Sequence, residues 1–394
     1  MKKKIIVLTA TRAEYGLLRP IIKALDNQGA FDVRIAVTGA HLSPEFGLTY
    51  KEIQNDNISI DKKIEILLSS DTPVSISKSM GLAMISFAEY FEESRPDALM
   101  VLGDRYETLA VCCAAMNARI PVIHLYGGET TEGAVDEAVR HSISKMSYLH
   151  FTSTETFRKR VIQLGEAPDR VFNVGAVGIE NALRNTLLTR KELEESLKFS
   201  LGSDFAVVTF HPVTLDRRSA ECQFLQILKA FDQFTDMNMG MKYIFTKSNA
   251  DADGRIINKM ADEYAACHKN AACFDSLGTQ RYLSALKECT MVIGNSSSGL
   301  IEAPSFKVPT INIGDRQMGR LQADSIINCS AECAYIVEAM ETAVSEEFRN
   351  TLATVENPYG DGHTSEKIVC ILQKELLDKE INLKKRFYDL NFHI

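Results

Sequence analysis

The sequence predicts an α/β protein built from two doubly wound domains. Short runs rich in Val, Ile and Leu alternate with segments whose apolar residues recur at helical spacing, which is typical of parallel sheets covered by helices. The alternation loosens at residues 175–189 and then begins again. A chain of 394 residues is also long enough for two hydrophobic cores. We therefore expect two similar halves with a cleft between them.

Strands and helices are expected in a regular order along both halves. In the first half, strands are predicted at 5–9, 33–38, 98–103, 122–125, 149–152 and 171–174, and helices at 17–25, 106–117 and 154–164. In the second half, strands are predicted at 205–210, 243–246, 291–294 and 310–313, and a helix at 224–234. The predicted domains are 1–185 and 186–365, followed by a C-terminal segment, 366–394, with a last helix over 365–383. The first domain is one candidate surface for that helix to pack on.

The composition argues against several classes of protein. The formal net charge is −8 and no basic stripe appears, which argues against a nucleic-acid-binding protein. No run approaches about 18 consecutive apolar residues, so no membrane-spanning helix is expected. Nine cysteines occur without a CxxC pair, which argues against a disulfide framework and against a structural zinc site. We expect a cytoplasmic protein, since that compartment keeps thiols reduced.

Ionisable residues follow two of the strands predicted in the first half. Asp104 and Arg105 come directly after one strand, and Glu129, Asp136 and Arg140 follow the next one. Ligands of open α/β sheets bind outside the carboxyl ends of the strands, so this placement favours proton transfer beside an anionic ligand. Asp136 and Arg140 lie four residues apart, and on a helix Arg140 would keep Asp136 ionised or bind the anion. The alternatives are a solvated helix start and a plain surface ion pair.

A glycine- and serine-rich segment opens a predicted helix in the second half. Residues 294–299 read Gly-Asn-Ser-Ser-Ser-Gly, and the free N–H groups of a helix start together with the hydroxyls of Ser296 and Ser297 suit a diphosphate. The segment is no Walker loop, because Lys-Ser/Thr is missing after the glycine. An ordinary serine N-cap is the alternative. Glu302 lies one turn further along, where a carboxylate can accept two ribose hydroxyls.

Three more residues are candidates for contact with a phosphate. Arg12 follows the first strand among small and hydroxylated residues, although a surface arginine at a helix start is the alternative. His211 precedes Pro212, which lacks an N–H and stops the strand, so His211 is expected at the end of the second sheet. Arg316 follows the strand at 310–313 and offers a second cation there.

Taken together, these motifs resemble those of the UDP-N-acetylglucosamine 2-epimerases, especially the hydrolysing branch that makes N-acetylmannosamine for sialic acid. The resembling segments run in the same order through nearly the whole chain: TRAEYG at 11–16, VTGAHL at 37–42, GDRYE at 103–107, GGE at 127–129, RHSISKM at 140–146, RVIQLGE at 160–166, GNSSSGLIE at 294–302 and NIGDRQ at 312–317. The resemblance implies the GT-B arrangement, in which two Rossmann-like domains hold the nucleotide mainly through the second. It implies no metal and no nicotinamide cofactor.

The resemblance also implies which residues act. The expected catalytic residues are Asp104, Glu129, Asp136, Arg140 and His211, and the expected substrate-binding residues are Arg12, Arg105, Ser296, Ser297, Glu302 and Arg316. Many members of the family have a glutamate, an acid/base candidate, where this chain has Tyr126. Either Glu129 takes over that duty or the reaction depends on Asp104 and Asp136.

The activity that the resemblance implies is conversion of UDP-N-acetylglucosamine to N-acetylmannosamine and UDP, by anti elimination to a glycal followed by hydration. The chief alternative is a hydrolysing 2-epimerase of UDP-N,N'-diacetylbacillosamine on the legionaminic acid route, whose substrate differs at C4 and C6 of the sugar. Weaker alternatives are a non-hydrolysing epimerase, a glycosyltransferase of the same fold and a sensor that binds a nucleotide sugar without turnover. We expect a UDP-sugar ligand, no nucleic-acid or membrane partner, and a homodimer or homotetramer.

Overall fold

The computed structural model describes residues 2–68, 72–130, 135–184, 186–212, 219–237, 240–247 and 254–391. They form two compact units, the first comprising Met1–Asn181 and Tyr359–Ile394 and the second comprising Ala182–Pro358. The prediction of a two-domain α/β protein is confirmed. The chain leaves the first unit after Asn181 and returns to it at Tyr359.

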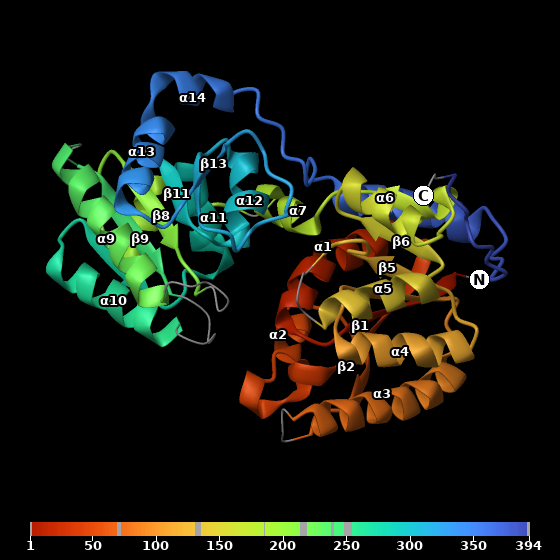
Figure 1. Cartoon of the computed structure of the whole chain (residues 1–394). Helices are drawn as coiled ribbons and strands as arrows, with labels where there is room; N and C mark the ends of the chain where they lie inside the picture. The colour runs from red at the N-terminus through yellow and green to blue at the C-terminus, as the bar shows by residue number, and fades with distance from the viewer. Residues whose placement is uncertain are drawn as a thin grey trace. The chain divides into compact units, whose positions relative to one another are not determined.

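The first unit contains a seven-stranded parallel sheet with the strand order β3-β2-β1-β4-β5-β6-β7 (Figure 1). The strands are β1 (Lys3–Thr9), β2 (Phe31–Thr38), β3 (Ile60–Ile64), β4 (Ala98–Leu102), β5 (Val122–Leu125), β6 (Leu149–Thr152) and β7 (Val171–Asn173). In the centre of the sheet, Ile5 of β1 is paired with Val33 on one side and with Ala98 on the other. Because the strands are parallel, their carboxyl ends share one edge of the sheet.

Helices cover both faces of this sheet. They are α1 (Arg12–Gln28), α2 (Tyr50–Asn55), α3 (Pro73–Ser94), α4 (Tyr106–Asn117), α5 (Asp136–Met146), α6 (Glu155–Gln163), α7 (Val177–Arg184) and α15 (Thr364–Leu372). Helices α1 and α15 share one hydrophobic core with Ile5 and Val7, whereas α3 and α4 share the other with Ile6 and Leu8. Successive side chains of β1 thus point to opposite faces, as the period of a strand requires.

The end of the chain packs on the first unit. Helix α15 contacts α1 and is followed by one π-helical turn, Gln373–Leu377. The predicted continuation of this helix to residue 383 is wrong, because no helix follows the π-helical turn. The extended stretch beyond it is held by Lys385, whose Nζ lies 2.6 Å from Glu166 Oε2, and by the N–H of Tyr388, which donates to the carbonyl of Gly165.

The second unit contains a six-stranded parallel sheet with the strand order β10-β9-β8-β11-β12-β13. Its strands are β8 (Phe205–Thr209), β9 (Lys242–Thr246), β10 (Ala271–Phe274), β11 (Met291–Gly294), β12 (Thr310–Ile313) and β13 (Ile326–Cys329). Its helices are α8 (Arg190–Leu197), α9 (Ala220–Met237), α10 (Gly254–Cys267), α11 (Gly278–Glu288), α12 (Ser297–Ile301), α13 (Cys333–Val344) and α14 (Glu346–Leu352). Short 3₁₀ helices occur in both units. They are Gly39–Leu42, Pro44–Phe46 and Pro168–Arg170 in the first unit and Ala303–Phe306 in the second.

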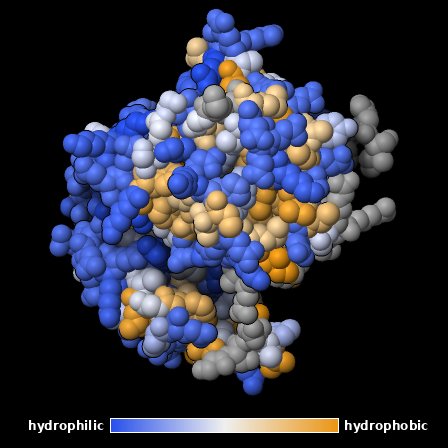
Figure 2. Space-filling view, turned by 90° about the vertical axis from the view of Figure 1, so that its left-hand side faces the viewer, coloured by the Kyte–Doolittle hydropathy of each residue, from blue (hydrophilic) through white to orange (hydrophobic). Residues whose placement is uncertain are grey.

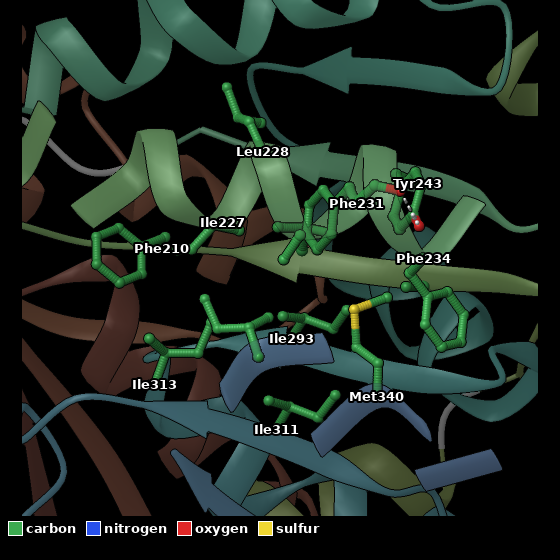
Figure 3. Close-up of a cluster of buried hydrophobic side chains, with 14 of the residues drawn as sticks. Phe210, Ile227, Leu228, Phe231, Phe234, Tyr243, Ile293, Ile311, Ile313 and Met340 are labelled. Carbon is green, nitrogen blue, oxygen red and sulfur yellow. Dashed lines mark hydrogen bonds between the residues drawn. The ribbon is translucent and has the colours of Figure 1, made fainter. Parts of the chain in front are cut away.

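Aromatic residues form much of the core on one face of the second sheet. The rings of Phe231 on α9 and Tyr243 on β9 stack with their centroids 4.3 Å apart, and Phe234 and Met340 lie in the same cluster (Figure 3). Stacked rings of this size bury a large apolar area, so the face that α9 and α13 cover is rigidly packed. A rigid sheet fixes the positions of the loops at its carboxyl edge.

The outer surface is of mixed polarity. On the face drawn in Figure 2, hydrophobic residues form separate patches among hydrophilic ones. Over the described ranges, every helix is too short or too polar to cross a membrane.

Candidate active site

The predicted site residues fall into two groups, one at the carboxyl edge of each sheet. The first unit carries Arg12, Asp104, Arg105, Glu129, Asp136 and Arg140, and the second carries His211, Ser296, Ser297, Glu302 and Arg316. Each group is described by itself. In both sheets this is the edge where open α/β folds place their ligands.

Arg140 is the centre of the first group. Its side chain is only 4% exposed, and its guanidinium contacts the carboxylate of Asp104. It also donates to the backbone carbonyl of Glu129 at 2.8 Å and to Glu137 Oε2 at 3.1 Å. A buried guanidinium requires partners of this kind, because an unpaired buried charge is strongly destabilising. Arg140 therefore joins the loops that follow β4 and β5 to helix α5.

Pairing with Asp136 was one of two roles that the sequence left open for Arg140, and the structure gives Arg140 other carboxylate partners. Asp136 is the first residue of α5 and is exposed, and the structure pairs Arg140 with Asp104 and Glu137 instead. Glu137 also accepts from His141 Nε2 at 3.1 Å, so one carboxylate serves two residues of the same helix. The spacings of three and four residues from Glu137 to Arg140 and His141 are the signal that the sequence offered for this cluster.

Glu129 lies in a tightly packed turn after β5. Its Oε1 accepts from the Ser153 hydroxyl at 2.7 Å. The preceding Gly128 has φ +81°, and a Cβ there would lie 2.4 Å from the backbone oxygen of Phe157. Only glycine allows this approach. The turn is therefore held against α6, and the carboxylate of Glu129 has a fixed place.

Tyr126 serves the fold of the first unit. It has a left-handed backbone, φ 66°, and its hydroxyl accepts from the N–H of Val177, the first residue of α7, at 3.0 Å. Its ring packs against the core that α1 and α15 share. The hydroxyl thus satisfies a donor at the start of a helix, a common need of helix termini.

Two arginines of the first group are paired with carboxylates of their own unit. Arg12 Nε lies 2.9 Å from Glu52 Oε1, and its side chain is 72% exposed. Arg105 Nε donates to Glu107 Oε1 at 2.5 Å and lies 4.0 Å from Glu14 Oε1. Glu14 and Glu107 lie within motifs quoted from the sequence but were not predicted as site residues.

Glu14 is a buried carboxyl group with two roles. Its Oε2 accepts from the N–H groups of Ala10 and Thr11, which closes the capping box at the start of α1. Burial raises the pKa of Glu14 to about 7, and the nearby Glu107 raises it as well, while the bond from Ala10 opposes the rise. Near neutral pH this carboxyl group therefore holds a proton in part of the molecules.

The serine-rich segment of the second unit begins a short helix. Ser296 is the N-cap of α12, and its Oγ accepts from the N–H of Ser298 at 3.4 Å. The serine cap that the sequence left as an alternative is thus present at Ser296. Ser297 is the first residue of the helix, and Glu302 is its C-cap.

Glu302 is a carboxyl group removed from water. Desolvation raises the pKa of Glu302 to about 7, although the nearby Ser298 lowers it. Within the described ranges, its Oε2 is buried without a hydrogen-bond partner. A buried acceptor of this kind is satisfied when a hydroxyl or N–H donor reaches it, which fits the proposed contact with ribose.

His211 and Arg316 meet a common neighbour, Asn295. The N–H of His211 donates to Asn295 Oδ1 at 2.7 Å, and Arg316 Nη1 donates to the backbone carbonyl of Asn295 at 3.1 Å. Gln317 Nε2 donates to the same carbonyl at 2.8 Å. Asn295 and Gln317 were not predicted as site residues, since their bonds depend on how the loops after β8, β11 and β12 approach one another.

The metal-ligating residue types do not gather in the described part of the chain. No group of three or more His, Cys, Asp or Glu residues there is arranged to hold a metal ion.

Two parallel, doubly wound sheets in separate units place the chain in the GT-B-like class of two-domain α/β proteins. Residues 23–373 match the family model described as UDP-N-acetylglucosamine 2-epimerase. The chain belongs to this family.

The chain is similar over almost its full length to two characterised relatives. A Campylobacter jejuni protein named GDP/UDP-N,N'-diacetylbacillosamine 2-epimerase (hydrolyzing) is 44% identical over 392 residues, which cover 99% of this chain and 100% of the relative. The polysialic acid biosynthesis protein P7 of Escherichia coli is 41% identical over 389 residues, 98% of each chain.

A solved structure has a similar fold. The crystal structure of the Neisseria meningitidis UDP-GlcNAc 2-epimerase bound to UDP-GlcNAc aligns with a TM-score of 0.77 over 94% of this chain and 100% of that chain. The sequence identity is 21%, so this likeness shows the fold alone.

Proposed function

We propose that this protein is a hydrolysing 2-epimerase that converts a UDP-linked 2-acetamido sugar into UDP and the free 2-epimeric sugar. The observation that carries the proposal is the similarity to a hydrolysing 2-epimerase across 99% of the chain. The two groups of site residues support it, because one is rich in carboxylates and the other has a serine-capped helix start beside Arg316.

The sugar that the enzyme prefers is proposed from the relatives. The sequence motifs alone favoured UDP-N-acetylglucosamine. The relative at 44% identity is named for N,N'-diacetylbacillosamine, which favours UDP-N,N'-diacetylbacillosamine as the substrate. The relative at 41% identity is named for polysialic acid biosynthesis, which keeps UDP-N-acetylglucosamine as the second candidate. The two sugars differ at C4 and C6 and have the same groups at C1 and C2, so the same chemistry applies to both.

The reaction must remove a weakly acidic proton from C2 while the bond from C1 to the diphosphate breaks. The diphosphate leaves only if its developing charge is stabilised, and we assign this duty to Arg12, Arg316 and the amides of Ser296 and Ser297, with His211 nearby. Anti elimination then gives a glycal and UDP. Water adds to the double bond, a proton is delivered to the opposite face of C2, and the 2-epimer leaves.

Carboxylates of the first unit are proposed to move the protons. Removal and delivery of a proton need groups in opposite protonation states, so two carboxyl groups in different environments are required. Asp104 lies against the buried Arg140 guanidinium, whereas Asp136 is exposed. The contact with Arg140 orients Asp104, and Asp136 is the second candidate for moving a proton.

Glu129 is the proposed substitute for the glutamate that many family members have at the position of Tyr126. If Glu129 transfers a proton in the reaction, Glu129→Gln should lower kcat about 10²- to 10⁴-fold, as loss of a general acid or base does. Ser153→Ala removes only the hydroxyl that donates to Glu129 and should have a smaller effect. Full activity of Glu129→Gln would leave the proton transfers to Asp104 and Asp136.

The reaction itself is tested by incubating the protein in D2O with UDP-N,N'-diacetylbacillosamine and, separately, with UDP-N-acetylglucosamine, and by following the products by NMR. We expect UDP and a free 2-epimer with deuterium at C2, without added metal or nicotinamide. Release of UDP without deuterium at C2 would contradict the elimination mechanism. The relative kcat/KM of the two sugars decides the substrate, and turnover of neither sugar would refute the proposed function.

A further inference from the structure

Asn295 lies at the point where three loops of the second unit meet. It follows the last residue of β11 directly and is 1% exposed. Its side chain and the backbone of His211 form two hydrogen bonds in opposite directions. The N–H of His211 donates to Asn295 Oδ1 at 2.7 Å, and Asn295 Nδ2 donates to the carbonyl of His211 at 2.8 Å. These two bonds fasten the backbone at His211, just after β8, to the side chain of Asn295.

The backbone of Asn295 holds the loop after β12. Its carbonyl accepts from Arg316 Nη1 at 3.1 Å and from Gln317 Nε2 at 2.8 Å. Gln317 is itself buried, so its amide can stay in place without competition from bulk water. One buried residue therefore joins the loop that carries His211 to the loop that carries Arg316.

The place of Asn295 is fixed by the glycine before it. Gly294 has φ +136°, and a Cβ at this position would lie 1.9 Å from the backbone oxygen of Thr209. The ends of β8 and β11 can approach this closely only because the side chain is absent. The N–H of Asn295 then donates to that same Thr209 oxygen at 3.1 Å.

We infer that Asn295 is a positioning residue of the nucleotide site, which sets the places of His211 and Arg316 relative to each other. This inference rests on the proposed function, in which Arg316 stabilises the diphosphate and His211 lies near it. Contact with two groups of one anion requires that both lie at fixed positions. A primary amide suits the task, because it offers a donor and an acceptor without placing a charge beside the two phosphates.

The test compares Asn295→Ala with Asn270→Ala. Asn270 lies before β10, at the opposite end of the sheet, where its Nδ2 donates to the carbonyl of Met241. Both variants lose side-chain hydrogen bonds within the second unit, so thermal unfolding measures the structural cost of each. Calorimetric titration should show that Asn295→Ala binds UDP at least about tenfold more weakly than the wild type, because buried hydrogen bonds are lost. Asn270→Ala should bind UDP with wild-type affinity.

Hydrogen exchange separates this inference from the proposed function, because it needs no nucleotide. In Asn295→Ala without UDP, the backbone amide of His211 loses its acceptor and should exchange faster than in the wild type, while the amides of β9 should not. Unchanged exchange at His211 would overturn the inference even if the protein binds UDP. Failure of the wild-type protein to bind UDP would instead refute the proposed function, and the exchange rates would still decide the role of Asn295.

Asn295→Asp supplies a readout that a merely structural residue would not move. The new carboxyl group keeps the acceptor for the N–H of His211, but only its protonated form can donate to the carbonyl of His211. Burial raises the pKa of a carboxyl group. The ratio of variant to wild-type UDP affinity should therefore rise as the pH falls from about 8 to about 5. A ratio that stays constant, or UDP affinity of Asn295→Ala within twofold of wild type, would overturn the inference.

Discussion

The two groups of site residues differ in how their polar atoms are satisfied. In the first unit, the charged groups are paired with each other, as Asp104 is with Arg140 and Arg105 is with Glu107. In the second unit, neutral amides join the loops, as Asn295 and Gln317 do. Within the described ranges, buried oxygens without a hydrogen-bond partner occur in both units, as Glu14 Oε1 and Glu107 Oε2 do in the first and Glu302 Oε2 and Gln317 Oε1 do in the second.

This difference indicates a division of labour. In the first unit, ion pairs with arginine hold the carboxylates in place, and the arginine charges offset the carboxylate charges. This arrangement suits carboxylates that transfer protons in every catalytic cycle. Neutral amides hold the loops of the second unit without placing a negative charge beside an anionic ligand, and Arg316 lies on one of those loops. The first unit is therefore suited to proton transfer and the second to binding, and the variants below test that contrast.

The largest effect is expected in the first unit, where Asp104→Asn and Asp136→Asn are nearly isosteric changes. Each should lower kcat about 10²- to 10⁴-fold, because each removes a candidate acid or base. UDP affinity, measured by calorimetry, should stay within a few fold of wild type. Asp97→Asn is the matched control at the amino end of β4, where Asp97 accepts from the N–H of Lys4. Near wild-type turnover in both site variants would overturn the assignment of proton transfer to Asp104 and Asp136.

A smaller effect is expected in the second unit, and it should appear in binding. Arg316→Ala and Glu302→Ala should each weaken UDP binding by about 1.5 to 3 kcal/mol, the range for hydrogen bonds to charged groups. Arg320→Ala changes an exposed arginine of the same loop and should leave the affinity unchanged. Unchanged UDP affinity in both Arg316→Ala and Glu302→Ala would place the nucleotide elsewhere and break the contrast.

The buried carboxyl group of Glu14 should make the stability of the first unit depend on pH. Burial raises its pKa from 4.5 to about 7, so the stabilisation present below pH 4.5 is lost as the pH rises through about 7. Glu14→Gln keeps an acceptor for the N–H groups of Ala10 and Thr11 and should flatten this dependence by about 1 to 2 kcal/mol. Urea unfolding at several pH values measures it. An unchanged pH profile would show that Glu14 is ionised throughout.

The smallest effect is expected for Tyr126→Phe, which removes the hydroxyl that accepts from Val177. The free energy of unfolding should fall by about 1 kcal/mol, the usual contribution of one hydrogen bond. The value of kcat should not change, because the hydroxyl serves the start of α7. A loss of turnover without a loss of stability would show that Tyr126 acts on the substrate and would add a phenol to the proton-handling groups.

Much of the fold could be predicted from the sequence, and the strands that were missed have a feature in common. Strands such as β4 and β11 are buried on both faces, so all their residues are buried. Such strands consist of nearly continuous apolar residues, which can be recognised in the sequence. Three strands were not predicted, β3, β10 and β13, and all lie at edges of their sheets. Strand β3 reads Ile-Asp-Lys-Lys-Ile with its middle exposed, so it has no apolar run.

Helix α3 was missed for a different reason. It buries Phe87 and Phe91 but also exposes Val74 and Ile85, so polar and apolar residues are not separated into two faces. The helical period is then weak in the sequence, because the period depends on that separation.

The site was predictable as a set of residues and less so as a set of contacts. Positions at strand ends follow from local patterns, which is why Asp104 and Arg316 could be named. The partner of Arg140 on the loop after β4 depends on the pairing of β4 with β5, which is a tertiary contact. Asn295 lies inside a motif that the sequence singled out, but its function depends on the close approach that Gly294 allows.

The return of the chain to the first unit reverses the usual order of assembly on the ribosome. Helix α15 covers α1, yet it belongs to Tyr359–Ile394, which is translated after the whole of Ala182–Pro358. Domains generally form as units, the N-terminal one first. Here Leu18 and Ile21 of α1 gain their neighbours Ile368 and Leu372 only after the whole of the second unit has been translated. The unit that is started first is therefore finished after the second one, and α15 cannot cover the apolar face of α1 until then.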